Sequence, residues 1–134
     1  MKILTAAPNG AGQPALLRIP LFILALAASG ATQAQVPPTP QEKAAYAGLH
    51  GAAARGDAAQ IRALAAKLAG GGVDARDGHG RTPLHVAAYG GAHNAMRALA
   101  AAGANVNALE NDRYDIVTIA AVANDVPTLQ VALE

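Results

Sequence analysis

Cysteine and tryptophan are absent from this sequence of 134 residues, and aromatic residues make up only 3% of it. The single phenylalanine and the single serine, Phe22 and Ser29, both lie in the first 30 residues. Residues 35–134 therefore lack the serine and cysteine nucleophiles of most covalent catalysts, and their threonines have no histidine and carboxylate at a suitable spacing. We expect no intrinsic catalysis and no cofactor.

A charge excess of either sign is also lacking, because ten basic residues stand against nine acidic ones. With neither a basic excess nor aromatic side chains for base stacking, the sequence argues against a nucleic-acid partner. It contains no basic amphipathic helix that would bind a membrane surface. Alanine and leucine are abundant instead, so that 52% of the sequence is hydrophobic, and both residues favour helix.

The N-terminus has the three-part pattern of a secretory signal. Residues 1–18 contain Lys2 and Arg18 and no acid, an apolar run follows at 19–28, and a small, polar stretch occupies 29–35. This order is typical of a cleaved signal peptide. The apolar run is too short for a spanning helix, which needs roughly 20 apolar residues. The alternatives are an uncleaved anchor and a buried helix. We expect export, with the periplasm as the compartment.

Cleavage is expected after Ala34, so that residues 1–34 form the signal peptide, with Ala31 as the alternative site. No membrane attachment is then expected, since no cysteine near the cut could carry a lipid. A proline-rich linker follows at 35–40 and ends in a capping box. Thr39 is the cap of that box and Glu42 its third residue. The folded domain is expected over 41–134.

The rest of the sequence repeats itself. Residues 84–99 align with 49–64 at an offset of 35, and residues 106–121 align with 73–88 at an offset of 33. The two extra residues fall within 67–72. Self-similarity at a fixed period of this size is the signature of a repeat architecture.

Every repeat predicts the same elements. A short helix carries an Ala-Ala pair, a tight turn follows, and a second helix has apolar residues at helical spacing, such as Ile61 and Leu64. A projecting turn rich in Asp, Gly and Asn then leads to the next unit. We expect three units, at about 41–74, 75–107 and 108–134, of which the last is incomplete.

With this period, the Thr-Pro-Leu-His tetrad at 82–85 resembles the ankyrin repeat. The resemblance covers about 45–134. The first unit keeps only Leu-His at 49–50, and the third has Asp-Ile-Val-Thr at 115–118. The resemblance implies an all-α ankyrin-repeat solenoid of about three helix-turn-helix units with projecting β-hairpin or turn fingers.

The resemblance also implies that the tetrad is structural. Thr82 can cap its helix, and Pro83 fills the first helical position, where a missing N–H costs nothing. Leu84 is expected in the core. In ankyrin folds the histidine hydrogen-bonds between backbone segments, which is the role implied for His85 and His50. Two turn glycines are also expected to be structural, Gly91 and Gly103.

A metal site is not expected. His79 and His93 are placed on a finger tip and an outer turn, too far apart to share an ion, and His85 already has a structural role. Residues 73–80 faintly resemble a calcium loop but lack its alternating carboxylates.

Ankyrin repeats generally bind proteins through the finger tips and the exposed ends of the first helices, on the concave side. The resemblance therefore implies a protein-binding module, and Tyr and Arg are preferred anchors at interfaces. The alternative is that these positions are ordinary solvated residues. The candidate partner-binding residues are Arg55, Arg76, His79, Arg81, Tyr89, Asn111, Asp112, Arg113, Tyr114 and Val122.

The sequence stops within the second helix of the third unit. Leu129, Val131 and Leu133 do not give this unit the polar outer face of a terminal repeat. Either the sequence is a fragment, or something else covers this face. The alternative function is therefore a structural or assembly role, in which this end docks another chain or a second copy.

Overall fold

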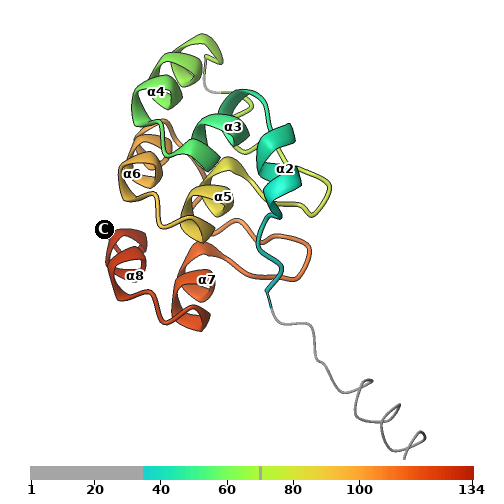
Figure 1. Cartoon of the computed structure of the whole chain (residues 1–134). Coiled ribbons are helices and arrows are strands. Elements are labelled where there is room, and N and C mark those ends of the chain that lie inside the picture. Colours follow the sequence, from blue (N-terminus) through green and yellow to red (C-terminus); the bar gives the residue numbers. More distant parts are fainter. Residues whose placement is uncertain (1–34, 70) are drawn as a thin grey trace, which may run out of the picture. The chain divides into compact units, whose positions relative to one another are not determined.

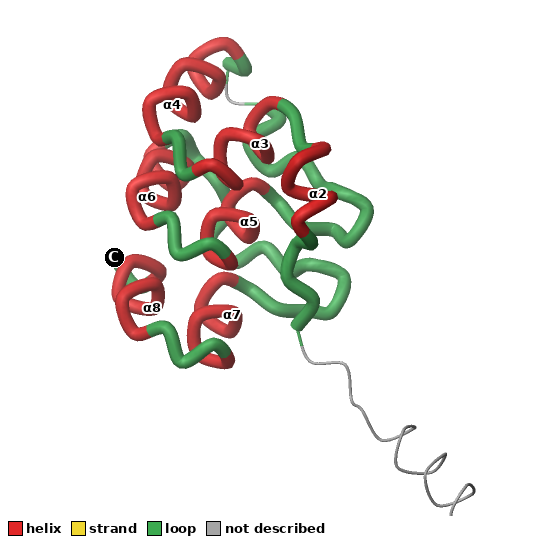
Figure 2. Tube along the Cα trace, in the orientation of Figure 1, coloured by secondary structure: helices red, strands yellow, loops and turns green. Residues whose placement is uncertain are grey.

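A computed structural model describes residues 35–134 with the exception of residue 70. The predicted signal peptide lies outside the described residues. In the described part, the chain folds into helices joined by turns, and none of its residues forms a β-strand (Figure 2). The helices are α2 (Pro40–Ala45), α3 (Gly48–Arg55), α4 (Ala58–Lys67), α5 (Pro83–Tyr89), α6 (His93–Ala101), α7 (Ile116–Val122) and α8 (Val126–Ala132).

The helices from α3 onward form three successive pairs, α3–α4, α5–α6 and α7–α8 (Figure 1). The first helices of the pairs contact one another in one layer, and the second helices form a second layer beside it. The short helix α2 packs on α3. The predicted all-α repeat solenoid is confirmed.

Side-chain caps start most of these helices. The hydroxyl of Thr39 accepts from the backbone N–H of Glu42 at 3.2 Å, and the N–H of Thr39 donates to the Glu42 carboxylate at 2.7 Å. This is the predicted capping box. The third unit lacks Thr-Pro, but Asp115 and Asp125 cap α7 and α8 by accepting from Thr118 and Thr128 N–H groups. Loss of the tetrad therefore does not leave α7 uncapped.

The turn within each pair needs left-handed backbone. Gly56 and Gly91 have φ values of 70° and 62°, and Asn124 takes the same conformation at 53°. This region is open to glycine and is tolerated by asparagine. The predicted turn role of Gly91 agrees with this geometry.

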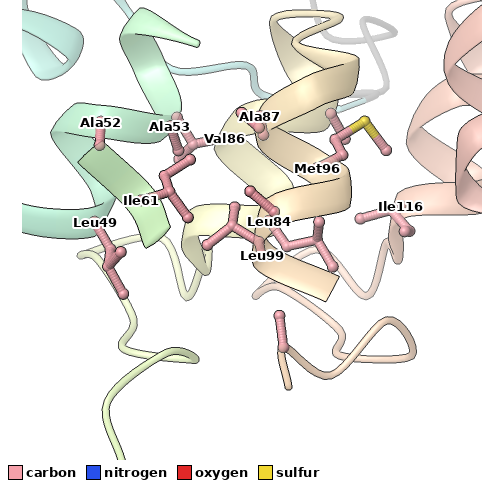
Figure 3. Close-up of a cluster of buried hydrophobic side chains, with 14 of the residues drawn as sticks. Leu49, Ala52, Ala53, Ile61, Leu84, Val86, Ala87, Met96, Leu99 and Ile116 are labelled. Carbon is pink, nitrogen blue, oxygen red and sulfur yellow. The ribbon is translucent and has the colours of Figure 1, made fainter. Parts of the chain in front are cut away.

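Small side chains fill much of the core. Ala52, Ala53 and Ala87 are almost wholly buried where the first helices meet, and Leu84 is 1% exposed (Figure 3). Short side chains let helix backbones approach closely, so the core gains its energy from many small contacts. The larger buried side chains in Figure 3 include Ile61, Met96, Leu99 and Ile116.

The fingers between the pairs are turns rather than the β-hairpins that were allowed for. A backbone bond from Asp77 N–H to Arg81 C=O, at 3.0 Å, closes the first finger, and Glu110 N–H to Tyr114 C=O, at 3.1 Å, closes the second. One such bond per finger is too few for a β-ladder. These bonds nevertheless make each finger a compact, closed loop.

Candidate protein-interaction surface

His85 joins the second repeat to the next finger. Its Nε2 lies 2.9 Å from the carbonyl oxygen of Ala108 and 3.2 Å from that of Tyr114. Its Nδ1 accepts from the N–H of Thr82 at 3.1 Å, so the proton is assigned to Nε2. Burial lowers the pKa of His85, although the two carbonyls oppose this shift, and the ring is neutral at pH 7. The predicted backbone contacts of His85 are present.

His50 makes the equivalent contact one repeat earlier. Its Nε2 lies 2.9 Å from the carbonyl oxygen of Arg81, the position that corresponds to Tyr114 in the next finger. The third repeat has Thr118 in place of the histidine. The histidine links therefore run from the first pair to the first finger and from the second pair to the second finger.

Arg81 corrects the sequence prediction, which placed it on an exposed finger tip. Its side chain is 0% exposed. The guanidinium donates to Asp77 from Nε at 2.7 Å, to Glu42 from Nη2 at 2.6 Å, and to the carbonyl of Val36 from Nη1 at 3.1 Å. Because these partners surround it, Arg81 holds the finger, α2 and the segment before α2 together, and it is not an exposed side chain while that segment is in place.

The carboxylates around Arg81 are stabilised in their charged form. Burial works against ionisation of Asp77, but hydrogen bonds from Tyr46 and Arg81 outweigh it and lower the pKa of Asp77 to about 2. The backbone N–H of Thr39 and the Arg81 guanidinium lower the pKa of Glu42 to about 2 as well. Nε2 of His79 lies 3.0 Å from Oε1 of Glu42. The base of the first finger is thus a network of paired charges.

Arg76 links the two fingers. Its Nη1 donates to the carbonyl of Gly80 at 2.8 Å and to that of Leu109 in the next finger at 2.6 Å. The backbone bond from Asn111 N–H to His79 C=O, at 3.0 Å, makes a second link between the two tips. The fingers therefore support each other as one surface.

The two tyrosines expected to be exposed are half-buried and pack against the core. In addition, the hydroxyl of Tyr89 and both carboxylate oxygens of Glu110 are buried with no hydrogen-bond partner among the described residues. Burial, followed by repulsion from Asp112, raises the pKa of Glu110. Tyr89 and Tyr114 are thus not free anchors, because much of each ring is already in contact with the fold.

A comparison with family models gives the classification. The model described as ankyrin repeats (3 copies) matches residues 44–134. The chain belongs to the ankyrin-repeat family. Ankyrin repeats generally mediate protein–protein interactions, and the family is typically a non-catalytic binding module. No curated protein matches the sequence.

Register explains the special environment of Arg81 in these ankyrin repeats. By the offsets of 35 and 33, Tyr46, Arg81 and Tyr114 occupy one position in successive repeats. By the same offset of 33, Asp77 and Glu110 occupy one position in the two fingers. Asp77 has Arg81 beside it in its own finger, whereas Glu110 has Tyr114. The second finger therefore keeps the carboxylate without the arginine that would neutralise it.

The remaining candidates divide into two groups. We define the tip cluster as His79, Asn111, Asp112 and Arg113, all of which are exposed and lie on the joined ankyrin fingers. Arg55 and Val122 are exposed as well, but they are the last residues of α3 and α7. At 1.5 Å per helical residue, this is roughly 10 Å from the finger end of those helices. The structure thus brings four of the ten predicted residues together at the tips.

Sequence reasoning missed the segment that precedes α2. Gln35 donates from Nε2 to the carbonyl of Thr118 at 3.1 Å, and Val36 accepts from Arg81. The proline-rich composition predicted a linker, because it shows neither helical nor strand periodicity. The only signal that pointed to the contact between this segment and Arg81 was the capping box, because its residue Glu42 bonds Arg81.

Among the described residues, no group of three or more His, Cys, Asp or Glu side chains is placed to hold a metal ion. His93 binds the hydroxyl of Thr128, with 3.0 Å between Nε2 and Oγ1. No helix of the described region combines the length and the apolar character needed to cross a bilayer.

The C-terminal pair leaves a groove against the second repeat. The groove has a volume of about 530 Å³, and Leu133 at its edge is 68% exposed. Arg97 and Glu134 form a bidentate pair across it, with both N–O distances at 2.7 Å. Apolar side chains make up much of its lining, including Leu84, Met96, Val106, Ile116, Val117 and Val131.

Proposed function

We propose that this ankyrin-repeat protein is an exported protein-binding module that acts through its concave face, the side of the fingers and first helices. The tip cluster carries the proposal. Its four residues are exposed, while the fingers beneath them are braced by Arg76 and by the buried charge network. Side chains held on a rigid support lose little entropy on binding, which favours recognition. No catalytic step is proposed.

A paired set of variants tests the concave face. Partners are first captured from the exported fraction on the full chain and identified by mass spectrometry. The tip variant carries both His79→Ala and Asp112→Ala, and the control variant carries both Asn94→Ala and Gln130→Ala. The affinity of an identified partner is then measured for each double variant. The control residues are exposed on α6 and α8, away from the fingers.

The tip variant is expected to bind at least tenfold more weakly, a loss of about 1.4 kcal/mol, and the control is expected to bind normally. Both should retain their helical circular dichroism, because all four side chains are on the surface. Equal affinity of the two variants would refute the tip cluster as the binding site.

Export is supported by the order of charged, apolar and small residues in the predicted signal peptide. N-terminal sequencing of secreted protein is expected to begin between residues 32 and 35. Mature protein that begins at Met1 would refute cleavage.

A structural or assembly role is the second candidate, favoured by the C-terminal groove and by exposed Leu133. In this case the groove docks another chain or a second copy. Sedimentation of the full chain and of Leu133→Asp distinguishes the two functions. Self-association that Leu133→Asp abolishes, with partner binding unaffected by the tip variant, would favour assembly.

A further inference from the structure

The residues before α2 lie against the repeats rather than away from them. We define the arm as residues 35–39, Gln-Val-Pro-Pro-Thr. Its first residue binds Thr118 in α7, its second binds Arg81 in the first finger, and its last caps α2. Five residues reach at most about 17 Å when extended. The arm runs from the last repeat to the first along the finger side (Figure 2).

The contacts of the arm are those of a bound peptide. One backbone carbonyl of the arm is held by the buried Arg81 guanidinium at 3.1 Å, one side-chain amide is held by a helix carbonyl at 3.1 Å, and Pro38 is buried. Two consecutive prolines restrict the free chain to extended conformations, so little entropy is lost on docking. Since the Val36 contact uses only a main-chain carbonyl, any extended segment could supply it.

Most contacts that hold the site lie outside residues 35–38. Besides Val36, Arg81 is bonded to Asp77 and Glu42, and Glu42 is bonded to Thr39 at the end of the arm. Thr118 is in α7, whose cap is Asp115. The arm is thus an occupant of a surface that other contacts hold in place.

We infer that this surface, centred on Arg81 and Thr118, is the docking site for an extended, proline-containing segment of a protein partner, and that the arm occupies it in the free protein. The inference rests on the proposed function and names the chemistry of the partner. The partner segment would present a backbone carbonyl to Arg81, a hydrogen-bond donor to Thr118, and a proline where Pro38 is buried.

The arm and a partner segment would compete for the same surface, and the tether of the arm sets the strength of this competition. A short tether gives the arm an effective concentration in the millimolar range. A separate segment with a similar contact set must exceed that concentration to displace the arm. Removing the side-chain contacts and the prolines of the arm is therefore expected to increase the affinity for such a segment by at least tenfold.

The test uses a synthetic peptide with the sequence of residues 35–40, acetylated and carrying a fluorophore at its C-terminus. The arm variant replaces Gln35, Val36, Pro37 and Pro38 with glycine in the full chain and keeps Thr39, so that the cap of α2 remains. It loses the Gln35 amide, the buried Pro38 ring and the stiffness of the two prolines, while the carbonyl of residue 36 is kept on a flexible chain. Fluorescence polarisation is expected to show at least tenfold tighter peptide binding by the arm variant than by the unchanged protein. Gln35→Gly alone, which removes one bond, is expected to fall between them.

A peptide in which both prolines are alanine is the matched control and is expected to bind the arm variant more weakly. Equal binding of the peptide to the unchanged protein and the arm variant would overturn the inference, as would the absence of binding to both. If the unchanged protein is a dimer that the arm variant dissolves, the occupant is the arm of a second copy, and a partner segment is refuted.

The tip variant separates this inference from the proposed function. One outcome is that the tip variant has a lower affinity for the captured partner, while the arm variant binds the partner and the peptide with the same affinities as the unchanged protein. In that case the concave-face function stands and the inference fails. If neither variant changes partner affinity, the concave face itself is refuted. Circular dichroism of the arm variant checks that its helices are intact.

Discussion

Replacing Asp77 with asparagine tests the charge network at the base of the first finger. In the native fold, Oδ2 of Asp77 accepts from the hydroxyl of Tyr46 at 2.6 Å and from Nε of Arg81 at 2.7 Å, while Oδ1 accepts from the N–H groups of His79 and Arg81. An asparagine would set its NH₂ group against two donors. Turning the amide over would break the two backbone bonds instead.

The magnitude follows from the pKa of Asp77, which the fold lowers from 3.8 to about 2. Each unit corresponds to 1.36 kcal/mol, so the charged form contributes about 2 kcal/mol to stability. The side chain is only 10% exposed, and solvent screening is small. Breaking a buried pair also leaves Arg81 with one carboxylate fewer. We expect Asp77→Asn to lose about 2–3 kcal/mol at pH 7.

The pH dependence has a definite sign. Because the folded pKa is below the unfolded one, the stabilisation by Asp77 is present above about pH 4 and is lost as the pH falls towards 2. The difference between Asp77→Asn and the parent should therefore shrink across this window. Urea unfolding followed by circular dichroism at 222 nm measures it, since the sequence has no tryptophan.

Asp112→Asn is the matched control, because Asp112 is an exposed carboxylate on the second finger. Its effect should stay within about 0.5 kcal/mol. A loss of less than 0.5 kcal/mol for Asp77→Asn at pH 7 would refute the reasoning. A difference that persists unchanged at pH 2 would show that the charge is not its cause.

Three further results are expected. Glu110→Gln should raise the free energy of unfolding at pH 7. The fold raises the pKa of Glu110, so the native state loses stability as this carboxyl ionises with rising pH. Urea unfolding at several pH values should therefore show a smaller gain in stability towards acid pH for the variant than for the parent. His85→Ala should cost on the order of 1–3 kcal/mol in urea unfolding by freeing buried carbonyls, and an unchanged stability together with lost peptide binding would contradict its structural role. Amides of α7 and α8 should exchange hydrogen faster than those of α5 and α6, because among the described residues α7 and α8 pack against a helix pair on one side only. Equal protection by mass spectrometry would contradict this.

The repeat architecture could be predicted because the residues that start and end the helices of the second unit lie close together in the sequence. The tetrad starts α5 through a local cap and a local proline, and the turn glycines act through their own backbone angles. The backbone hydrogen bonds of His85 could be predicted because the ankyrin pattern includes this histidine. Such features depend on residues close in sequence or on a repeated register.

The environment of Arg81 could not be predicted in the same way. An arginine beside a turn is usually solvated, and its burial here requires Glu42, 39 positions earlier, to approach it. The same holds for the arm, whose contact with Thr118 spans 83 positions. The half-burial of Tyr89 and Tyr114 likewise depends on their packing against the core. Local patterns carry no information on such convergences.

The contact between Gln35 and Thr118 also changes the order in which the protein comes apart. In a linear array each repeat contacts only its neighbours, whereas this hydrogen bond joins positions 83 residues apart in the chain. Long-range contacts of this kind form late in folding, after the local helices that present them. A pulling force applied at the N-terminal end of the described chain would therefore load this bond before any helix. The first extension should be the few residues of the arm, with all three helix pairs still folded.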